Sequence, residues 1–219
     1  KLISLSDQTT VTSGVAFSPD GRYLASSAWD KTIYIRDAKT YDSITAFTAH
    51  QNAINTIAFS SDSKYLSSGA TNNAVWEADN TVKVWGVPTG NLVCTFEGHL
   101  DGVNKVVFEP NTHRVYSCSN DGTLKLWNPD LCGIEATFTA ATDDNYIIFN
   151  KDYYYTGTKD ALKGIAFKID DRLYPFEQFD LIYNALSFGI AAMGAGFIFF
   201  ALARSYVAPK YRPALLVSA

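Results

Sequence analysis

Short apolar segments followed by polar turns recur at regular distances along the first part of the chain. Three of them align position by position, and each enters a turn built from Pro, Asp, Gly, Asn or Ser at residues 15–21, 57–63 and 106–112. Phe17 stands 42 residues before Phe59, and Phe59 stands 49 residues before Phe108. A period of this size indicates a repeated structural unit.

Each repeat continues with two more strand-like segments. One alternates apolar and polar residues, which is the period of a half-buried strand, at residues 32–35, 81–85 and 123–127. The other closes the repeat at residues 43–47, 92–96 and 135–138. About four short antiparallel strands in a period near 42 residues are typical of a β-propeller blade. The second repeat is longer by seven residues, which we assign to a loop between Gly69 and Asn80.

Polar and aromatic residues also recur at fixed places in the second and third repeats. The two sets are His50, Ser68, Asp79 and Trp85, and His99, Ser117, Asp121 and Trp127. With these residues, positions 11–138 resemble the WD-repeat family. In that family the four side chains form a buried hydrogen-bond chain, in which a neutral histidine donates at one ring nitrogen and accepts at the other. The resemblance therefore implies two structural tetrads and no Ser-His-Asp catalytic triad.

The first repeat and the region after the third depart from this pattern. In the first, Ser26 and Asp30 fit, whereas Gln8 takes the histidine position and Arg36 the tryptophan position. Residues 142–180 keep strand-like segments without histidine or tryptophan, so we expect a decayed fourth blade. The predicted fold is all-β, a partial WD-repeat propeller of three to four four-stranded blades. Because so few blades do not easily close a ring, we expect a fragment or a chain that takes extra blades from a partner.

Residues 173–180 resemble the closing segment of WD-repeat regions that precede caspase-like peptidase domains in some large bacterial proteins. No catalytic residue is carried over, because the histidines are His50, His99 and His113 and the last cysteine is Cys132. Outside the tetrads the sequence offers no glycine-rich phosphate loop, metal-ligand cluster or nucleophile–base pair. We therefore expect no enzyme, no catalytic residue and no metal.

An uncharged stretch lies between Asp180 and Arg204. Its most apolar part, residues 185–203, would reach roughly 28 Å as a helix, close to the thickness of a bilayer's hydrocarbon core. This pattern predicts a C-terminal transmembrane-type α-helix, with a buried soluble helix as the alternative. The basic residues that follow it, Arg204, Lys210 and Arg212, place its C-terminal end in the cytoplasm.

Residues 179–219 resemble the first helix and first cytoplasmic loop of light-driven proton-pumping microbial rhodopsins. Members of that family bind retinal through a lysine on their last helix, which this chain lacks, so retinal is expected only if the missing helices exist. We divide the chain into propeller blades at 1–175 and a hydrophobic helix with the start of a second helix at 176–219. Whether the two parts belong to one natural protein, or join two unrelated sequences, stays open here.

Composition narrows the classes of function. The chain has 219 residues, 47% of them hydrophobic, and a net charge of −4. This composition excludes a disordered chain and argues against a nucleic-acid binder, which normally carries a basic face. The three cysteines have no C-x-x-C spacing, which argues against a disulfide framework and a zinc site, and we expect reduced, buried thiols.

These observations favour a non-catalytic protein-interaction scaffold, tethered to a membrane through residues 181–204. Blades offer loops on which proteins or peptides dock without any chemistry. The partner-binding candidates, all expected to be exposed, are Trp29, Arg36, Tyr41 and Trp76. The predicted location is membrane-associated, or cytoplasmic if the helix is not inserted. The alternative function is a fragment of a light-driven proton-pumping rhodopsin joined to WD repeats.

Overall fold

The computed structural model describes residues 10–71, 79–142, 145–150, 155–158, 166–169 and 172–175. All regular secondary structure within these ranges is β-strand, as the all-β prediction requires. The chain divides into two compact units, Lys1–Ala140 with Ile148–Tyr155, and Ala141–Ile147 with Thr156–Ala219. The predicted apolar helix and the rhodopsin-like segment lie outside the described residues. Within the described ranges, no helix is long and apolar enough to cross a membrane.

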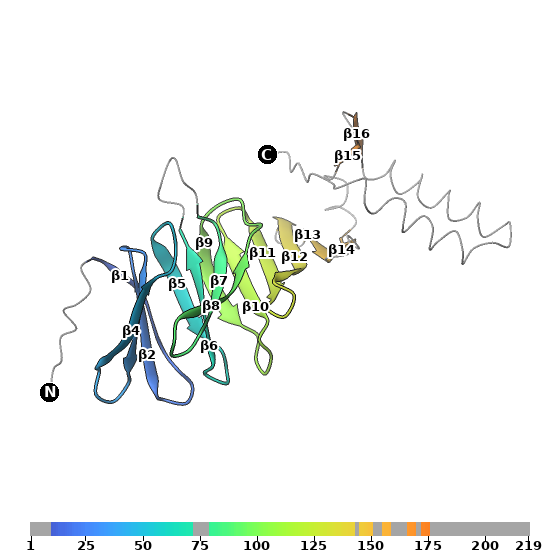
Figure 1. Ribbon diagram of the computed structural model, residues 1–219. Helices are drawn as coiled ribbons and strands as arrows, with labels where there is room; N and C mark the ends of the chain where they lie inside the picture. The colour runs from blue at the N-terminus through green and yellow to red at the C-terminus, as the bar shows by residue number, and fades with distance from the viewer. Residues whose placement is uncertain are drawn as a thin grey trace. The chain divides into compact units, whose positions relative to one another are not determined.

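Antiparallel sheets in which consecutive strands pair form the first unit (Figure 1). The first sheet consists of β1 (Thr12–Phe17), β2 (Tyr23–Ala28), β3 (Thr32–Asp37) and β4 (Ser43–Thr48). The second consists of β5 (Ile54–Phe59), β6 (Tyr65–Ala70), β7 (Val82–Gly86) and β8 (Asn91–Phe96). The third runs from β9 (Val103–Phe108) through β10 (Val115–Ser119) and β11 (Thr123–Asn128) to β12 (Gly133–Thr142). These strands match the three predicted repeats.

Further strands follow in the region where a decayed fourth blade was predicted. The third sheet continues past β12 with β13 (Asn145–Asn150) and β14 (Tyr155–Gly157), which makes it six-stranded. A separate two-stranded sheet pairs β15 (Ala166–Ile169) with β16 (Arg172–Pro175). The described residues of this region therefore extend the third sheet and form one hairpin, instead of a fourth four-stranded sheet.

The three sheets share one register, which gives each sheet two distinct faces. The serine of the second strand pairs with the third strand at Ser26↔Tyr34, Ser68↔Lys83 and Ser117↔Lys125. Because successive strand residues point to opposite faces, we call the face that carries this serine the tetrad face and the other the plain face. In the first sheet the tetrad face includes Val15 and Phe17, and the plain face includes Ala25 and Ile35.

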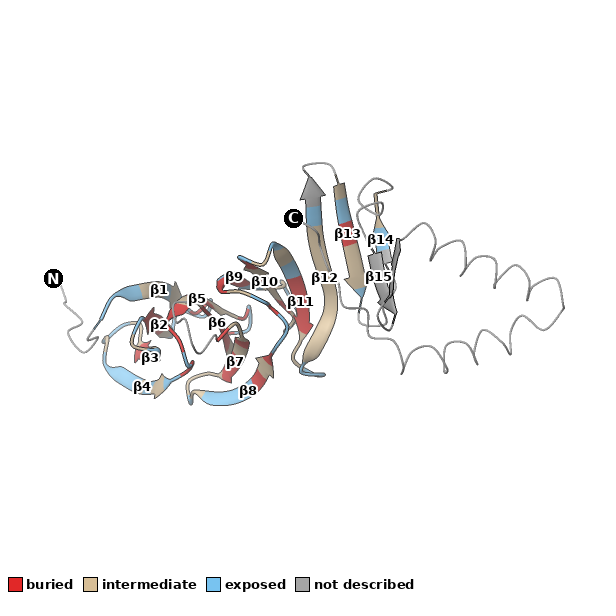
Figure 2. Ribbon diagram, turned by 90° about the horizontal axis from the view of Figure 1, so that it is seen from above, coloured by how far each residue is buried: buried red, intermediate tan, exposed pale blue. Residues whose placement is uncertain are grey.

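Two apolar cores lie between successive sheets, and both are built in the same way. The first joins the plain face of the first sheet to the tetrad face of the second, where it contains Ile57, Leu66 and Trp85. The second joins the plain face of the second sheet to the tetrad face of the third, where it contains Val106, Val115 and Trp127. The innermost strands β1, β5 and β9 lie next to one another. Figure 2 shows that the outer strand β4 is mainly exposed, whereas β8 is exposed only in its first half.

One prediction about the cysteines is wrong. Cys94 in β8 and Cys132 in the turn between β11 and β12 form a disulfide, with their Cα atoms 5.5 Å apart. Cys132 is exposed, and only Cys118 is a free thiol among the three cysteines. The sequence separation of 38 residues hides this proximity, which arises because the second and third sheets pack face to face. The bond therefore links two neighbouring sheets covalently.

Candidate functional site

The second sheet assembles the four residues that the repeat pattern singled out. His50 lies in the loop between β4 and β5, Ser68 in β6, Asp79 just before β7 and Trp85 in β7. The Nδ1 of His50 lies 3.0 Å from Oδ2 of Asp79, and its Nε2 lies 2.7 Å from Oγ of Ser68. The indole N–H of Trp85 donates to the same serine oxygen over 2.8 Å. The four side chains thus form one continuous hydrogen-bond chain.

One arrangement of protons, with a neutral histidine, satisfies every partner in this hydrogen-bond chain. A carboxylate only accepts, so Nδ1 of His50 carries its hydrogen and donates it to Asp79. Ser68 accepts the indole N–H and donates its own hydroxyl hydrogen to Nε2 of His50. The ring is therefore neutral. Burial lowers the pKa of His50, although the hydrogen bond to Asp79 and the negative charge of Asp79 act in the opposite direction.

Asp79 joins the loop that carries His50 to the turn before β7. Its Oδ2 also accepts the backbone N–H of Gln51 over 2.7 Å, and its Oδ1 accepts the hydroxyl of Thr81 over 2.5 Å. Burial alone would raise the pKa of Asp79, but the hydrogen bonds from His50, Thr81 and Gln51 outweigh burial and hold this pKa well below its usual range. The carboxylate therefore stays charged and binds two loops together.

The third sheet repeats this arrangement closely. His99 lies 2.9 Å from Oδ2 of Asp121 and 2.7 Å from Oγ of Ser117, which accepts the indole N–H of Trp127 over 2.7 Å. The backbone N–H of Leu100 donates to Asp121 over 2.9 Å. Burial alone would raise the pKa of Asp121, but the hydrogen bonds from Thr123, Leu100 and His99 outweigh burial and lower this pKa to about 2. Burial also lowers the pKa of His99.

Both tetrads have the Ser–His–Asp order of a hydrolase triad, but their side chains are buried, out of reach of a substrate. The histidine side chains are fully buried, and the serines are as well buried as the apolar core. Each serine oxygen also accepts an indole N–H from the neighbouring strand. A catalytic serine must face the scissile bond. Both Ser–His–Asp sets are therefore enclosed within the sheets, in the arrangement expected of structural tetrads.

The first sheet reaches the same register with different side chains. Arg36 pairs with Leu24 across the strands, as Trp85 pairs with Leu66 and Trp127 with Val115. The prediction that Arg36 is exposed is wrong, because only 4% of its surface is accessible. Its guanidinium lies 5.8 Å from the centre of the Tyr34 ring, and its Nη1 donates to the carbonyl of Tyr41 over 3.5 Å. A long apolar stem lets arginine fill the tryptophan position.

The other surface candidates differ in exposure. Trp29, in the turn between β2 and β3, is 53% exposed, and its backbone N–H donates to Val11. Tyr41, in the turn between β3 and β4, is only half-buried and has a positive φ of 67°. Trp76 lies outside the described residues. Trp29 is thus the predicted candidate that the structure places most clearly on the surface.

Sequence reasoning missed Leu100, whose side chain is 83% exposed. Its backbone N–H is fixed on the buried tetrad carboxylate of Asp121. A backbone that is ordered before binding lowers the cost of association, which makes this exposed side chain a candidate contact. Its place directly after the tetrad histidine is the signal that could have found it, although Gln51, which takes the same place after His50, is polar.

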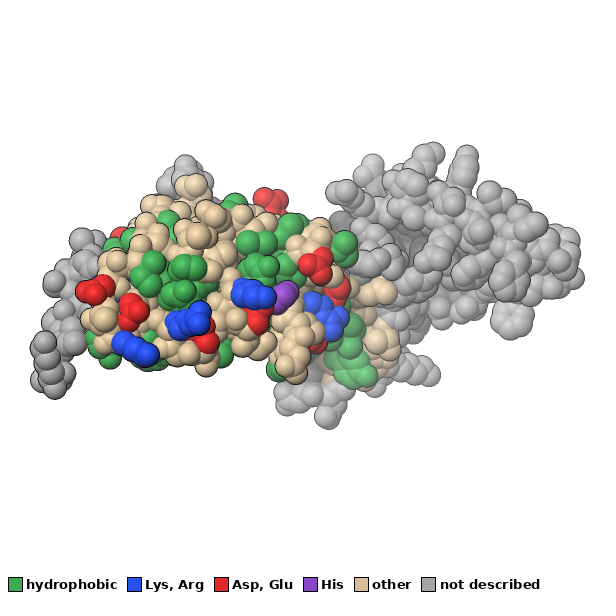
Figure 3. All heavy atoms as spheres, turned by 60° about the horizontal axis from the view of Figure 1, so that its bottom comes forward, with side chains coloured by type: hydrophobic (Ala, Val, Ile, Leu, Met, Phe, Trp, Pro, Cys, Tyr) green, Lys and Arg blue, Asp and Glu red, His purple; other side chains and the backbone are tan. Residues whose placement is uncertain are grey.

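Loops at the two ends of the sheets differ in chemistry. The end with the turns before β2, β6 and β10 carries mixed charges (Figure 3). Asp62 there lies 3.1 Å from Nε2 of His113 and 3.7 Å from Lys64, and Arg114 lies 2.7 Å from Glu109. The opposite end, which we call the tetrad end, carries Trp29, Leu100 and the loops tied by the tetrads. The two ends therefore present chemically different surfaces.

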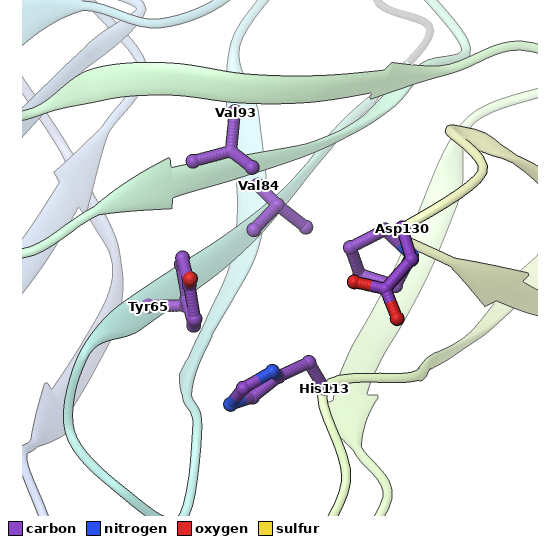
Figure 4. A pocket seen from close by; sticks show the side chains of 6 residues that line it. Tyr65, Val84, Val93, His113 and Asp130 are labelled. Atoms are coloured by element: carbon purple, nitrogen blue, oxygen red, sulfur yellow. The ribbon is translucent and has the colours of Figure 1, made fainter.

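A small pocket opens between the second and third sheets. It is lined by Tyr65, Val84, Val93, His113, Pro129 and Asp130 (Figure 4). The rings of Tyr65 and His113 meet edge to face, with their centres 4.8 Å apart. Its volume of about 50 Å³ is far below that of a small-molecule site, which is on the order of 300–1,000 Å³. The pocket is a small gap between the two disulfide-linked sheets.

Comparison with known families accounts for the repeats. The model of the WD40 family, described as WD domain, G-beta repeat, matches residues 2–37, 41–86 and 90–128. Each matched repeat after the first begins with the outer strand of the preceding sheet, β4 or β8, and then covers the three inner strands of the next. The sequence repeats are thus shifted by one strand relative to the sheets. The second and third repeats therefore include the loops that carry His50 and His99.

Among similar proteins are two of fungal origin and one human protein. Polyadenylation factor subunit 2 of Candida albicans is 30% identical over 52% of this chain and 20% of its own length. Nuclear distribution protein PAC1 of Coccidioides posadasii is 28% identical over 51% of this chain and 26% of its own length. Human pre-mRNA-processing factor 17 is 25% identical over 53% and 19%, respectively. The chain spans about a fifth to a quarter of these relatives.

Solved structures with a similar fold include those titled "Structure of U3-55K" and "Crystal structure of RRP9 WD40 repeats". Both are 21% identical to this chain with a TM-score of 0.54. They cover 70% of this chain, which matches 53% and 52% of theirs. This similarity supports the propeller-type arrangement of the sheets and does not extend to function. The resemblances of residues 173–180 to segments before caspase-like domains and of residues 179–219 to rhodopsins are not among these findings.

Proposed function

The chain belongs to the WD40 family, whose model matches more than half of its residues, and we propose that it acts as a non-catalytic protein-interaction scaffold. The tetrads use their Ser, His and Asp side chains for bracing, and the pocket between the second and third sheets is too small for a substrate. The function therefore resides in the surface that the sheets present, and it requires no cofactor.

The tetrad end is the proposed docking surface. Leu100 carries the proposal, because its backbone is fixed on Asp121 while its side chain is 83% exposed. Trp29, which is 53% exposed, adds a large aromatic surface at the same end of the sheets. Interface hot spots are enriched in tryptophan and gain from backbones that are ordered before binding. Protein or peptide segments with apolar side chains suit this surface.

A peptide-binding experiment tests this surface. A phage-displayed random peptide library is selected against the full chain, and the selected peptides are tested on Leu100→Asp and Trp29→Ala variants. We expect each variant to weaken binding at least about tenfold, which corresponds to about 1.4 kcal/mol. Leu92→Asp, which changes an exposed apolar residue on the outer strand β8, is the matched control. Equal binding to all variants would place the docking surface elsewhere.

Nucleic acid is not a proposed partner. The end of the sheets opposite the tetrad end alternates acidic and basic groups, such as Asp62 beside Lys64 and Glu109 beside Arg114. Phosphate backbones are bound by continuous basic surfaces. The net charge of −4 agrees with this assignment.

Membrane attachment through residues 181–204 is the finer part of the proposal, and the sequence alone supports it. The run at 185–203 is uncharged and is followed by Arg204 and Lys210. Flotation with phosphatidylcholine vesicles tests it: the full chain should float, and a chain ending at residue 180 should stay with the soluble fraction. Equal behaviour of both chains would remove the tether and leave the cytoplasmic alternative.

The rhodopsin alternative makes a separate optical prediction. It rests on residues 179–219, which lie outside the described residues. Adding all-trans retinal to the longest natural product that contains this chain should then produce a visible absorbance band. Absence of the band removes the alternative and leaves the scaffold proposal unchanged.

A further inference from the structure

The turn before the outer strand has a similar backbone shape in all three sheets, and in the third sheet it carries a cysteine. Tyr41 before β4, Gly90 before β8 and Cys132 before β12 have positive φ values of 67°, 73° and 45°. The three residues stand at the same place, five residues after Arg36, Trp85 and Trp127. This left-handed region favours glycine, because the Cβ of any other residue is crowded there. Cys132 therefore holds its thiol side chain at a position where glycine is the easier choice.

This turn position faces the outer strand of the preceding sheet. In the second sheet, a Cβ at Gly90 would lie 2.5 Å from the ring of Phe47 in β4 of the first sheet. In the third sheet, the side chain of Cys132 reaches β8 of the second sheet and is bonded there to Cys94. Its Sγ also lies 3.9 Å from the carbonyl oxygen of Val93. The same contact between neighbouring sheets is therefore made by packing at Gly90 and by a covalent bond at Cys132.

The two bonded sulfurs differ in access, although both residues belong to the first compact unit. Cys94 is only 3% exposed, whereas Cys132 is exposed. Disulfides exchange when an external thiolate attacks a sulfur that it can reach. The carbonyl oxygen of Pro129 lies 3.1 Å from Sγ of Cys94 and 3.5 Å from Sγ of Cys132, so a thiol formed at either sulfur has an acceptor. One sulfur is thus open to attack, and the other is sheltered as the leaving group.

We propose that the Cys94–Cys132 bond is a reversible exchange site for small, water-soluble thiols such as glutathione. The thiolate attacks Sγ of Cys132, the bond to Cys94 breaks, and the electron pair leaves on Sγ of Cys94, which takes up a proton. Cys132 then carries a mixed disulfide. A second small thiol attacks the sulfur of the first, which forms the small-molecule disulfide and leaves Cys132 as a thiol. The chain gains two electrons and two protons in total, and the two small thiols lose them.

Opening the bond releases the turn and leaves the packing between the second and third sheets in place. The core of that junction contains Val106, Val115 and Trp127, which stay buried without the bond. Val93 of the second sheet and Asp130 of the turn line the gap between these sheets from opposite sides (Figure 4). Reduction therefore frees one wall of this gap to move. The turn lies at the end of the sheets opposite the tetrad end, so this site is separate from the proposed docking surface.

The reactivity of single cysteines tests the direction of attack. Cys94→Ser keeps the exposed thiol at position 132, and Cys132→Ser keeps the buried thiol at position 94. Both changes are made in the full chain together with Cys118→Ser, which removes the third thiol. After treatment with oxidised glutathione in a mild detergent, Cys132 should form the mixed disulfide at least about tenfold faster than Cys94, because access limits exchange. Peptide mass mapping locates the adduct, and circular dichroism verifies that each variant folds. Equal rates, or faster reaction at Cys94, overturn the proposal.

Reversible opening is tested on the wild-type chain, which needs no substitution. The oxidised chain is incubated with reduced glutathione without denaturant, and the thiols are then trapped by alkylation. We expect the bond to open with an unchanged circular dichroism spectrum and to close again with oxidised glutathione. Hydrogen exchange at the amides of Leu131 and Cys132 should become at least about tenfold faster, while Val106 and Val115 keep their protection. A bond that opens only when the chain unfolds, unchanged exchange in the turn, or an oxidised chain with all three thiols free overturns the proposal.

Discussion

The first sheet and the two sheets that follow it adopt one register with different chemistry. In the second and third sheets, a tryptophan, serine, histidine and aspartate form a buried chain, with Nε2 of the histidine 2.7 Å from the serine in both. In the first sheet Arg36 stands where tryptophan would be, and Tyr34 donates its hydroxyl to Asp30 over 3.3 Å. The strands pair equally well in all three.

The comparison of the first sheet with the other two distinguishes the residues needed to form a sheet from the tetrad residues that tie its loops together. Alternating apolar residues such as Ile33 and Ile35 suffice for strand pairing and core packing. The turn aspartate persists as well, since Asp30 accepts the backbone N–H of Thr32 over 3.0 Å, as Asp121 does with Thr123 over 2.8 Å. What the intact tetrads add is a fixed link between loop and turn, through which Leu100 and Gln51 are held.

Removing Trp127 should cause the largest loss of stability and distinguish the third sheet from the first most clearly. Trp127→Ala deletes a fully buried ring stacked 5.2 Å from Phe96 and leaves Ser117 without its donor. We expect the free energy of unfolding to fall by about 3–5 kcal/mol. Arg36→Ala, at the same register position of the first sheet, should cost only about 1–2 kcal/mol. Urea denaturation followed by fluorescence measures both, and equal losses would contradict the distinction.

Reducing the disulfide should sharpen the contrast between the two sheet junctions. Cys94–Cys132 closes a segment of 38 residues and joins the second sheet to the third, a link that the junction of the first two sheets does not have among its described residues. Cys94→Ser should lower stability by about 2–4 kcal/mol. Cys118→Ser, which changes the free thiol, is the control. Addition of reductant should destabilise the wild-type chain and leave the Cys94→Ser variant unaffected.

Acidification should act through the two histidine-containing tetrads. The pKa of His50 and of His99 is lowered by burial, so the unfolded chain binds more protons once the pH falls below about 6.5. Stability is therefore fully present above this value and declines as the pH falls toward the folded pKa. The pKa of Asp121, about 2, extends the loss below about pH 4.

A double variant replaces both tetrad histidines with glutamine, the residue at the corresponding position of the first repeat. His50→Gln combined with His99→Gln places glutamine at both positions, as Gln8 stands in the first repeat. Denaturation midpoints measured from pH 8 to pH 5 should decline with acid in the wild type and be flatter in this variant. Parallel curves would mean that the histidines are not buried in neutral form.

The smallest effect is expected in the first sheet. Tyr34→Phe removes only the hydroxyl that donates to Asp30, a half-exposed contact. The loss should be about 0.5–1.5 kcal/mol. Thr123→Val, which removes the hydroxyl donated to Asp121 over 2.7 Å, is its counterpart in an intact tetrad and should cost more, because it leaves a better-buried carboxylate with one donor fewer. A larger loss for Tyr34→Phe would reverse the ranking of the two regions.

The features of the fold and the site that could be predicted from the sequence are those that repeat along it. The strands and the tetrad spacing repeat, so each copy supports the interpretation of the others, and Trp85 and Trp127 meet their serines as that interpretation expects. The burial of Arg36, the exposure of Leu100 and the bond between Cys94 and Cys132 depend on how neighbouring sheets pack. Each occurs once, so no second copy reveals it.

The central claim is that the two histidines brace the sheets as neutral rings, each donating from Nδ1 to aspartate and accepting at Nε2 from serine. Nitrogen-15 NMR of the imidazole rings of His50 and His99 tests it most directly. We predict the neutral tautomer with hydrogen on Nδ1 at pH 7 for both, with slow exchange of that hydrogen with water. Hydrogen on Nε2, a charged ring, or rapid exchange would show an accessible histidine and contradict the structural role.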